Sequence, residues 1–358
     1  MAVYLMLILA VFASLFLKID DRRQKQRWYI IIIFTSLTLI AMIRSWSVGV
    51  DTLQYYRNFS VIAQLDWKQI DLLRYEPGFF YFCKILSCLS TDPHILIAIS
   101  SLIIIPSVGR FIYKYSSHMA LSTYIYLTLN IYFFHLTGMR QSLAIAILLY
   151  GFDFLLKKKY IRYAGVVLLA ALFHSSAALL LFLIFLQMLP YKMNTYFRTM
   201  GVAAIGFFLY SFLFQYIARF FTQYAGYTHS EFGISNYFGS LLQFLLIFFL
   251  YTLAHYLHFH SDDLTKDHMV NDLCLRCLSV AVCVQAMAMR MNIIGRMSQY
   301  FLIFSIIAIP NMLYKFKEKN RFSWVLLTVT VLLAYWIIVG VLRPEWYGAI
   351  PYHTFMID

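Results

Sequence analysis

A polar segment at residues 44–78 separates two apolar runs near the start of the chain. It begins RSWSVGVDTLQYYRN and has YEPG at its end, so Asp51 and Glu76 are predicted at a membrane edge with several arginines nearby. Ionisable side chains are costly in such a place unless they face water or protein, and for that reason they usually serve a function. We interpret this segment as the main candidate for a reactive site.

Three side chains have the chemistry of a general base, which takes a proton from a reacting hydroxyl group. They are Asp51, Glu76 and His174. Either carboxylate can instead cap a helix by accepting a backbone N–H. His174 lies in the sequence FHSSA within an otherwise apolar run, where a histidine is often only a packed, hydrogen-bonded residue. Both interpretations stay open for each of the three residues.

A second group of side chains suits the binding of an anion, because arginine presents a planar fork of donors that matches phosphate oxygens. These candidate substrate-binding residues lie close to the ends of apolar runs and are Arg44, Tyr55, Arg140, Gln141, Arg290, Arg296 and Tyr300. Arg296 and Tyr300 are four residues apart, so a helix would place them on one face. The structural alternative for such an arginine is a side chain that extends to the membrane interface.

The composition is that of a helical membrane protein. The chain has 358 residues, of which 62% are hydrophobic and 13% charged, whereas soluble domains are about half apolar and about a quarter charged. Apolar runs of about 16 to 21 residues recur, which suits a hydrocarbon core roughly 30 Å thick. Runs such as LLQFLLIFFLYTLAHYL lack the alternation of barrel strands. We predict an all-α polytopic membrane protein with a single transmembrane domain over residues 1–358.

Clusters of basic residues predict which loops are cytoplasmic. They lie at residues 18–27, 157–162 and 315–321. An even number of crossings must separate loops on the same side, but five apolar runs lie between each neighbouring pair, so one run in each interval does not cross. We assign 77–90 as a re-entrant or interfacial helix, and 163–188 as a bent pair of short helices with His174 near its apex.

This layout gives about 10 to 12 transmembrane helices and an external segment at residues 44–94. The residues that it places outside are Arg44, Asp51, Glu76, Arg140, Arg290 and Arg296. Basic residues are normally scarce on that side, so this group breaks the rule that set the topology, and such violations are expected at functional sites.

Much of the net charge of +13 lies in short loops and does not indicate nucleic-acid binding. The lone C-x2-C at residues 274–277 has no second pair at zinc-ligand spacing, so we expect no metal and no cofactor.

As an ordered set, these motifs resemble the EpsG family of Wzy-type exopolysaccharide and O-antigen polymerases. The segments that carry the resemblance are Arg44 with the following VGVDT and Tyr55, EPGF at 76–79, RQSLA at 140–144, FHSSA at 173–177, and Arg296 with Tyr300-Phe301. The resemblance implies a multi-spanning, metal-independent glycosyltransferase in the bacterial inner (plasma) membrane, with its active site facing the periplasm.

The resemblance also implies the substrates, which are undecaprenyl-diphosphate-linked oligosaccharides acting as donor and acceptor. The growing glycan is transferred to the lipid-linked acceptor and the lipid diphosphate leaves. The residues are compatible with this reaction, because arginines can stabilise the departing diphosphate and Asp51, Glu76 or His174 can accept the proton of the attacking hydroxyl. The lipid bilayer and a chain-length regulator protein are the other implied partners.

Other classes of function stay open. A flippase or transporter of lipid-linked glycan also needs a basic cavity, but it would have helix breaks at matching positions of two halves, and the breaks near residues 77 and 174 do not match in this way. A membrane O-acyltransferase of surface polysaccharide would depend chiefly on a catalytic histidine and would leave the external carboxylates unexplained. Glycan ligation is a further alternative within glycan transfer.

Overall fold

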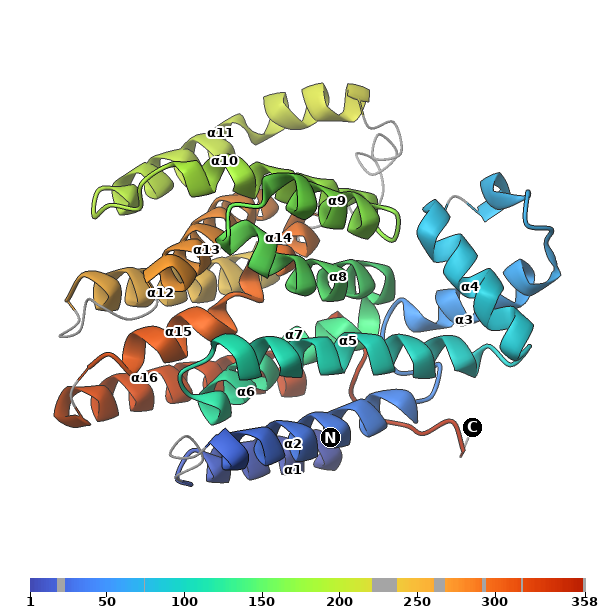
Figure 1. The fold of residues 1–358 in the computed structure, drawn as a ribbon, viewed down its shortest axis with the longest axis horizontal. Helices are drawn as coiled ribbons and strands as arrows, with labels where there is room; N and C mark the ends of the chain where they lie inside the picture. The colour runs from blue at the N-terminus through green and yellow to red at the C-terminus, as the bar shows by residue number, and fades with distance from the viewer. Residues whose placement is uncertain are drawn as a thin grey trace. The chain divides into compact units, whose positions relative to one another are not determined.

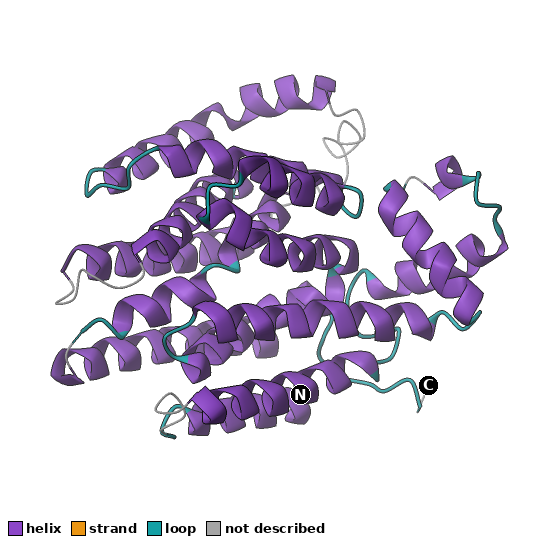
Figure 2. Cartoon of the chain, viewed as in Figure 1, coloured by secondary structure: helices purple, strands orange, loops and turns teal. Residues whose placement is uncertain are grey.

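The computed structural model describes residues 1–17, 23–73, 75–220, 237–260, 268–291, 294–316 and 318–356. Over these residues the chain forms sixteen α-helices and no strand (Figure 2), apart from an isolated antiparallel β-bridge between Arg44 and Thr354. The predicted all-α fold is confirmed. Residues 18–22 of the first basic loop and residue 317 of the third lie outside the described residues.

The helices are grouped into two compact units. Unit 1 comprises Met1–Ile184 and Ser323–Asp358, and unit 2 comprises Phe185–Phe322. The predicted single transmembrane domain stays a prediction, and the two units are considered separately below.

Unit 1 holds the N-terminal half of the chain together with its C-terminal end. Its elements are α1 (Ala2–Ser14), α2 (Arg23–Met42), α3 (Thr52–Gln64), η1 (Ile70–Leu73), α4 (Pro77–Leu89), α5 (His94–Tyr115), α6 (Met119–Thr128), α7 (Ile131–Thr137), α8 (Met139–Leu156), α9 (Tyr160–Ala171), η2 (Ser175–Leu181), the start of α10 (Phe182–Met188), most of α16 (Glu318–Ile337), η6 (Ile338–Leu342) and η7 (Pro344–Trp346). Helices α2, α5, α8 and α9 form a row in which each packs on the next (Figure 1).

Unit 2 is arranged around one helix. Its elements are the end of α10, α11 (Thr195–Phe220), α12 (Tyr237–His260), α13 (His268–Ala288), α14 (Gly295–Leu302), α15 (Ser305–Leu313) and the start of α16. Helix α13 packs against α11, α12, α14 and α15. Cys274 and Cys277 lie on α13 as buried free thiols, which favours the structural interpretation of the C-x2-C pair.

Five helices among the described residues are long and apolar enough to cross a membrane. They are His94–Tyr115, Met139–Leu156, Tyr237–His260, His268–Ala288 and Arg321–Leu342. Shorter apolar helices are Ala2–Ser14, Pro77–Leu89, Tyr160–Ala171 and Ser175–Met188. These findings confirm a polytopic helical membrane protein, whereas the number of crossings and the sides of the loops stay predictions.

The predicted break at His174 is present. Helix α9 ends at Ala171 and η2 starts at Ser175. The hydroxyl of Tyr163, near the start of α9, donates to the carbonyl of Leu180 at 3.2 Å. Seventeen residues of continuous helix would separate these two positions by about 25 Å, so η2 folds back along α9 as a bent pair.

Two further apolar runs are each divided into two helices. The run at 119–137 is divided into α6 and α7 by Asn130, whose φ of 60° is left-handed. Asparagine is one of the few residues other than glycine that adopts this conformation readily. The run at 297–314 is divided between α14 and α15. These two breaks come in addition to the segments at 77–90 and 163–188, which we assigned as re-entrant and bent.

Lys84 interrupts the apolar run at 77–90 for a structural reason. Its buried ammonium group donates to the carbonyls of Ile62, Ala63 and Leu65 at 3.3, 3.0 and 2.5 Å, at the end of α3. A cation there satisfies carbonyls that have no partner within the helix and complements the helix dipole. Lys84 thus holds α3 and α4 together. Helix α4 has 13 residues and is about 20 Å long, less than the hydrocarbon core.

Candidate active site

Three chain segments meet in unit 1: the start of α4, the start of α8 and the break after α9. The backbone N–H groups of Gly78 and Phe79 donate to the carbonyl of Leu172 at 2.8 and 3.3 Å. A Cβ atom on Gly78 would lie 2.8 Å from that carbonyl oxygen, so only glycine allows this approach without a shift. Pro77 occupies the first turn of α4, where its missing N–H costs nothing. The Pro-Gly pair therefore positions Glu76 beside the break at His174.

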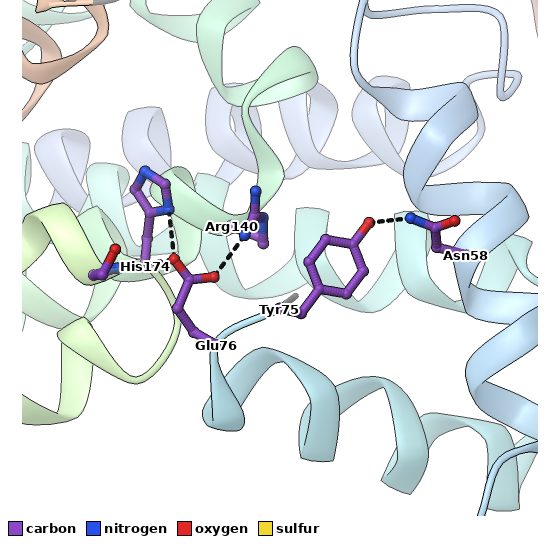
Figure 3. A network of polar contacts seen from close by, with 6 residues as sticks. Asn58, Tyr75, Glu76, Arg140 and His174 are labelled. Carbon is purple, nitrogen blue, oxygen red and sulfur yellow. Dashed lines mark hydrogen bonds and ion pairs between the residues drawn. The ribbon is translucent and has the colours of Figure 1, made fainter. Parts of the chain in front are cut away.

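Glu76 connects the three segments through both of its carboxylate oxygens (Figure 3). Oε2 accepts from Nη1 of Arg140 at 2.6 Å, and Oε1 accepts from the backbone N–H of Ser175 at 3.0 Å. Nδ1 of His174 lies 3.2 Å from the same Oε1. The structure thus brings together Glu76, Arg140 and His174, which we predicted as site residues from separate motifs.

These contacts decide the charge of Glu76. Burial opposes ionisation, but the contact with His174, the charge of Arg140 and the N–H of Ser175 outweigh it and lower the pKa of Glu76 from 4.5 to about 2. Such a carboxylate is ionised at neutral pH and has little affinity for another proton. Because a good general base has a pKa nearer to the operating pH, Glu76 is better suited to orient its two partners than to accept a proton itself.

Arg140 is held at an electrostatically unfavourable place. It is the second residue of α8, where the positive end of the helix dipole repels a cation. Glu76 compensates for this, as do the rings of Tyr75 and Tyr55, whose centroids lie 4.8 and 5.9 Å from Cζ of the guanidinium. A hydrogen bond also joins Arg140 to Tyr55. The arginine side chain is still 23% exposed.

An aromatic wall lies beside Arg140. The ring of Tyr75 packs edge-on against Phe79 at 5.2 Å, and Tyr55 packs on both at 6.4 and 5.7 Å. Nδ2 of Asn58 donates to the hydroxyl of Tyr75 at 2.6 Å, and burial raises the pKa of Tyr75 to about 12. The sequence analysis did not select Tyr75 or Asn58. The available signals were that Tyr75 precedes Glu76 and that Asn58 follows Tyr55 by three residues.

The VGVDT motif forms a turn around one backbone carbonyl just before α8. Thr52 Oγ1 lies 3.2 Å from the carbonyl oxygen of Leu136 and Arg44 Nη2 donates to the same oxygen at 3.2 Å. Gly49 has a φ of +104°, and a Cβ atom there would lie 2.7 Å from that oxygen. The motif therefore fixes the chain four residues before Arg140.

Arg44 itself is 1% exposed. It also donates to the carbonyl of Ala41 at 2.5 Å and to Ser101 Oγ at 2.8 Å, and no carboxylate in the described part of the chain forms an ion pair with it. Gln141 is 5% exposed. These positions favour a structural role for both residues, and their predicted contact with substrate stays a prediction.

Asp51 lies immediately before α3, but its side chain makes no capping hydrogen bond to that helix. The carboxylate is half-buried and lies one helical turn before Tyr55, which contacts Arg140. The helix-cap alternative for Asp51 is therefore not what the structure contains. Asp51 stays a candidate base close to the aromatic wall.

The remaining predicted residues belong to unit 2. Arg290 is exposed, and its guanidinium lies 5.4 Å from the ring of Phe207. Arg296 and Tyr300 lie on the same short helix, α14, where Arg296 is exposed and Tyr300 is 1% exposed. Their predicted role in substrate binding stays a prediction.

The comparison with known proteins agrees with the motifs. The model of the EpsG family matches residues 27–354, which is nearly the whole chain. No curated protein and no solved structure matches it.

Proposed function

The chain belongs to the EpsG family, and on that premise we propose that it polymerises a polysaccharide from lipid-linked oligosaccharide units. The donor is a glycan on undecaprenyl diphosphate and the acceptor is a second lipid-linked unit. An acceptor hydroxyl oxygen forms a bond to the anomeric carbon of the donor, the bond from that carbon to the diphosphate oxygen breaks, and the diphosphate leaves with the bonding electrons. The observation that carries the proposal is the Glu76–Arg140–His174 cluster.

We assign Arg140 to the departing diphosphate. Negative charge develops on this group as the glycosidic bond breaks, and a preorganised guanidinium stabilises it at no cost in reorganisation. The supporting observations are the partial exposure of Arg140 and its fixed position between Glu76 and Tyr75. The half-buried ring of Tyr75 would pack against a sugar ring of the substrate.

We assign His174 to the proton of the attacking hydroxyl. With Nδ1 facing Glu76, the neutral ring carries its proton on Nδ1 and presents the lone pair of Nε2, which points away from Glu76 (Figure 3). Nε2 accepts the hydroxyl proton, and the ionised Glu76 stabilises the imidazolium that forms. A base oriented by a third group in this way is a common arrangement in transfer enzymes. Asp51 is the alternative proton acceptor.

The direct test is polymerisation by the purified full-length protein in lipid nanodiscs. The substrate is a synthetic repeat unit on undecaprenyl diphosphate, and the product is a ladder of glycan lengths on a gel. We expect His174→Gln to lower the rate by about 10²-fold or more, as loss of a general base does, whereas the exposed His353→Gln serves as a control and keeps the wild-type rate. If His174→Gln gave wild-type ladders and Asp51→Asn gave none, Asp51 would be the base instead of His174.

Assays with the same protein and the same substrate separate the alternative functions. A flippase would leave the glycan length unchanged and move the lipid-linked unit across a proteoliposome membrane. An O-acyltransferase, supplied with an acyl donor, would increase the mass of the glycan by an acyl group. Either result, without a ladder from the wild-type protein, would contradict the proposed polymerase.

The proposed location is the bacterial inner membrane, with the Glu76 cluster facing the periplasm. The supporting observations are the apolar helices and the basic loop at residues 157–162, which the positive-inside rule predicts to be cytoplasmic. A chain-length regulator protein is a proposed partner, which co-purification with the membrane-extracted polymerase would test.

A further inference from the structure

A second cluster of chemically capable side chains lies in unit 2, where the end of α12 packs near the start of α13. His258 is in the last turn of α12, and His268 and Asp272 are in the first two turns of α13. One ligand atom from each residue lies within 4.8 Å of the others. We propose that these three side chains bind a divalent transition-metal ion, with Zn²⁺ as the probe.

The spacing of the cluster suits coordination. His268 and Asp272 are four residues apart on one helix and share a face, while His258 approaches from the neighbouring helix. Zinc takes imidazole nitrogen and carboxylate oxygen at about 2.0–2.2 Å, which places tetrahedral ligand atoms roughly 3.4 Å apart. Nε2 of His258 and Oδ1 of Asp272 already lie 3.2 Å apart. Rotation of the half-buried His268 supplies the remaining approach.

The kind and setting of the ligand atoms select the metal. Imidazole favours zinc and its transition-metal neighbours, whereas magnesium and calcium prefer oxygen ligands alone. Oδ1 of Asp272 is buried and accepts no hydrogen bond. Leaving a buried carboxylate oxygen without a hydrogen bond is costly, and a coordinated cation removes that cost.

Two nearby cationic side chains oppose the binding of a metal ion. The charge of Lys315 acts on both His258 and Asp272, and the charge of Arg276 acts on Asp272. Arg276 is already engaged elsewhere, because its Nη1 donates to the carbonyls of Leu186 and Leu189. Lys315 is therefore the main competitor for the carboxylate, and its removal should favour the metal.

The consequence of binding is a bond between two helices. A metal ion held by His258 on one side and by His268 and Asp272 on the other would fasten the end of α12 to the start of α13. Because the complete ligand set exists only in the folded protein, metal binding would stabilise unit 2 against unfolding. All three ligands belong to unit 2, and the transfer chemistry proposed above does not use them.

The experiment uses the full-length protein purified in detergent without a histidine tag and stripped of metal with EDTA. Titration with Zn²⁺ alone, followed by elemental analysis, gives the stoichiometry, and thermal unfolding gives the stabilisation. Co²⁺ in place of Zn²⁺ reports coordination through its visible absorption. The variants are Asp272→Asn, His268→Gln and Lys315→Met. The control is His260→Gln, since His260 is exposed on the last turn of α12 and stacks on Tyr256 at 4.3 Å.

We expect the wild type and His260→Gln to bind one zinc ion per chain and to unfold several degrees higher with zinc. Asp272→Asn and His268→Gln should lose both effects and the cobalt absorption, and Lys315→Met should bind zinc several-fold more tightly. The proposal would be overturned if zinc did not raise the unfolding temperature of the wild type. Undiminished stoichiometry and cobalt spectrum in both ligand variants would do the same, because the metal would then be held elsewhere, for example by the exposed thiol of Cys88.

Discussion

At the scale of single residues, Glu76 has the largest set of consequences. Its oxygens hold the guanidinium of Arg140 and the N–H of Ser175, and they face the ring of His174. Removing one partner of a largely buried ion pair typically costs about 3–5 kcal/mol, because the other charge is left without compensation. Glu76 therefore contributes to the stability of unit 1 as well as to the arrangement of the site.

The first prediction concerns the pH dependence that Glu76 confers. Its folded pKa of about 2 lies below the ordinary value of 4.5, so its stabilising contribution is fully present above about pH 4.5 and is lost as the pH falls through about 2. Glu76→Gln should lower the unfolding temperature by several degrees at pH 7. The difference in unfolding temperature between the wild type and the variant should become smaller as the pH falls below about 4.5. Thermal unfolding in detergent at several pH values measures this difference. A difference that does not change with pH would contradict the lowered pKa of Glu76.

The second prediction compares two substitutions of Arg140. Arg140→Ala should reduce polymer synthesis by about 10²- to 10³-fold, as the loss of one preorganised donor to a developing charge does. Arg140→Lys should retain part of the rate, because it keeps the charge but loses the planar fork. The readout is polymer length and rate at matched protein level.

Arg110→Ala is the matched control for Arg140, since Arg110 also lies over a tyrosine ring, that of Tyr150 at 4.4 Å, but away from the cluster. The control should keep nearly the wild-type rate. Normal chain length from Arg140→Ala would remove this residue from the proposed mechanism.

At the scale of the helices, the site depends on the contact between the start of α4 and the break after α9. The carbonyl of Leu172 is at the end of α9 and accepts from two N–H groups of α4. Lys84 attaches α4 to the end of α3. Helix α3 also contributes Tyr55, near its start, to the aromatic wall. The two breaks near residues 77 and 174 are therefore parts of one assembly.

The third prediction tests this contact with two glycines. Gly78→Ala places a Cβ atom 2.8 Å from the carbonyl oxygen of Leu172, so α4 must shift, at a cost of about 1–3 kcal/mol. We expect lower stability and at least a tenfold loss of polymer synthesis. Gly165→Ala on α9 meets nothing within 4 Å and should stabilise the helix by about 0.5–1 kcal/mol with normal activity. Equal behaviour of the two variants in unfolding and activity assays would argue against the contact.

At the scale of the whole molecule, the proposed topology decides which side of the membrane the site faces. The basic loop at residues 157–162 immediately precedes α9, and the break at His174 follows it. Helix α9 has 12 residues and a length of about 18 Å, less than the hydrocarbon core. Our topology therefore requires the break to open into a water-accessible external cavity rather than to reach the far surface by itself.

The fourth prediction tests the external access of this break. Ser175→Cys, in a background without the five native cysteines, should react with a membrane-impermeant thiol reagent added from outside. The backbone N–H that contacts Glu76 is kept in this variant, so the protein should stay active. The cysteine-free parent is the control for background labelling. Labelling only from the cytoplasmic side would reverse the proposed topology, and no labelling from either side would place the break in a closed interior.

Composition and local pattern by themselves determined the class of the protein. The length and apolarity of each run decide whether it forms a helix suited to the bilayer, and this is a property of consecutive residues. The position of the break at His174 was also predictable, because the polar FHSSA sequence interrupts an apolar run. The break at Asn130 was not, since a single asparagine adopts the left-handed conformation only where its surroundings favour it.

Only the tertiary structure decided which of the predicted site residues lie together and what surrounds them. Glu76 and Arg140 are 64 residues apart and Glu76 and Ser175 are 99 apart, so no local pattern fixes their contact. A carboxylate acts as a base or as an orienting group according to the charges and donors that surround it. Surrounded by Arg140, His174 and Ser175, Glu76 has a lowered pKa and is ionised at neutral pH. In our proposal it therefore orients its partners, and His174 accepts the proton.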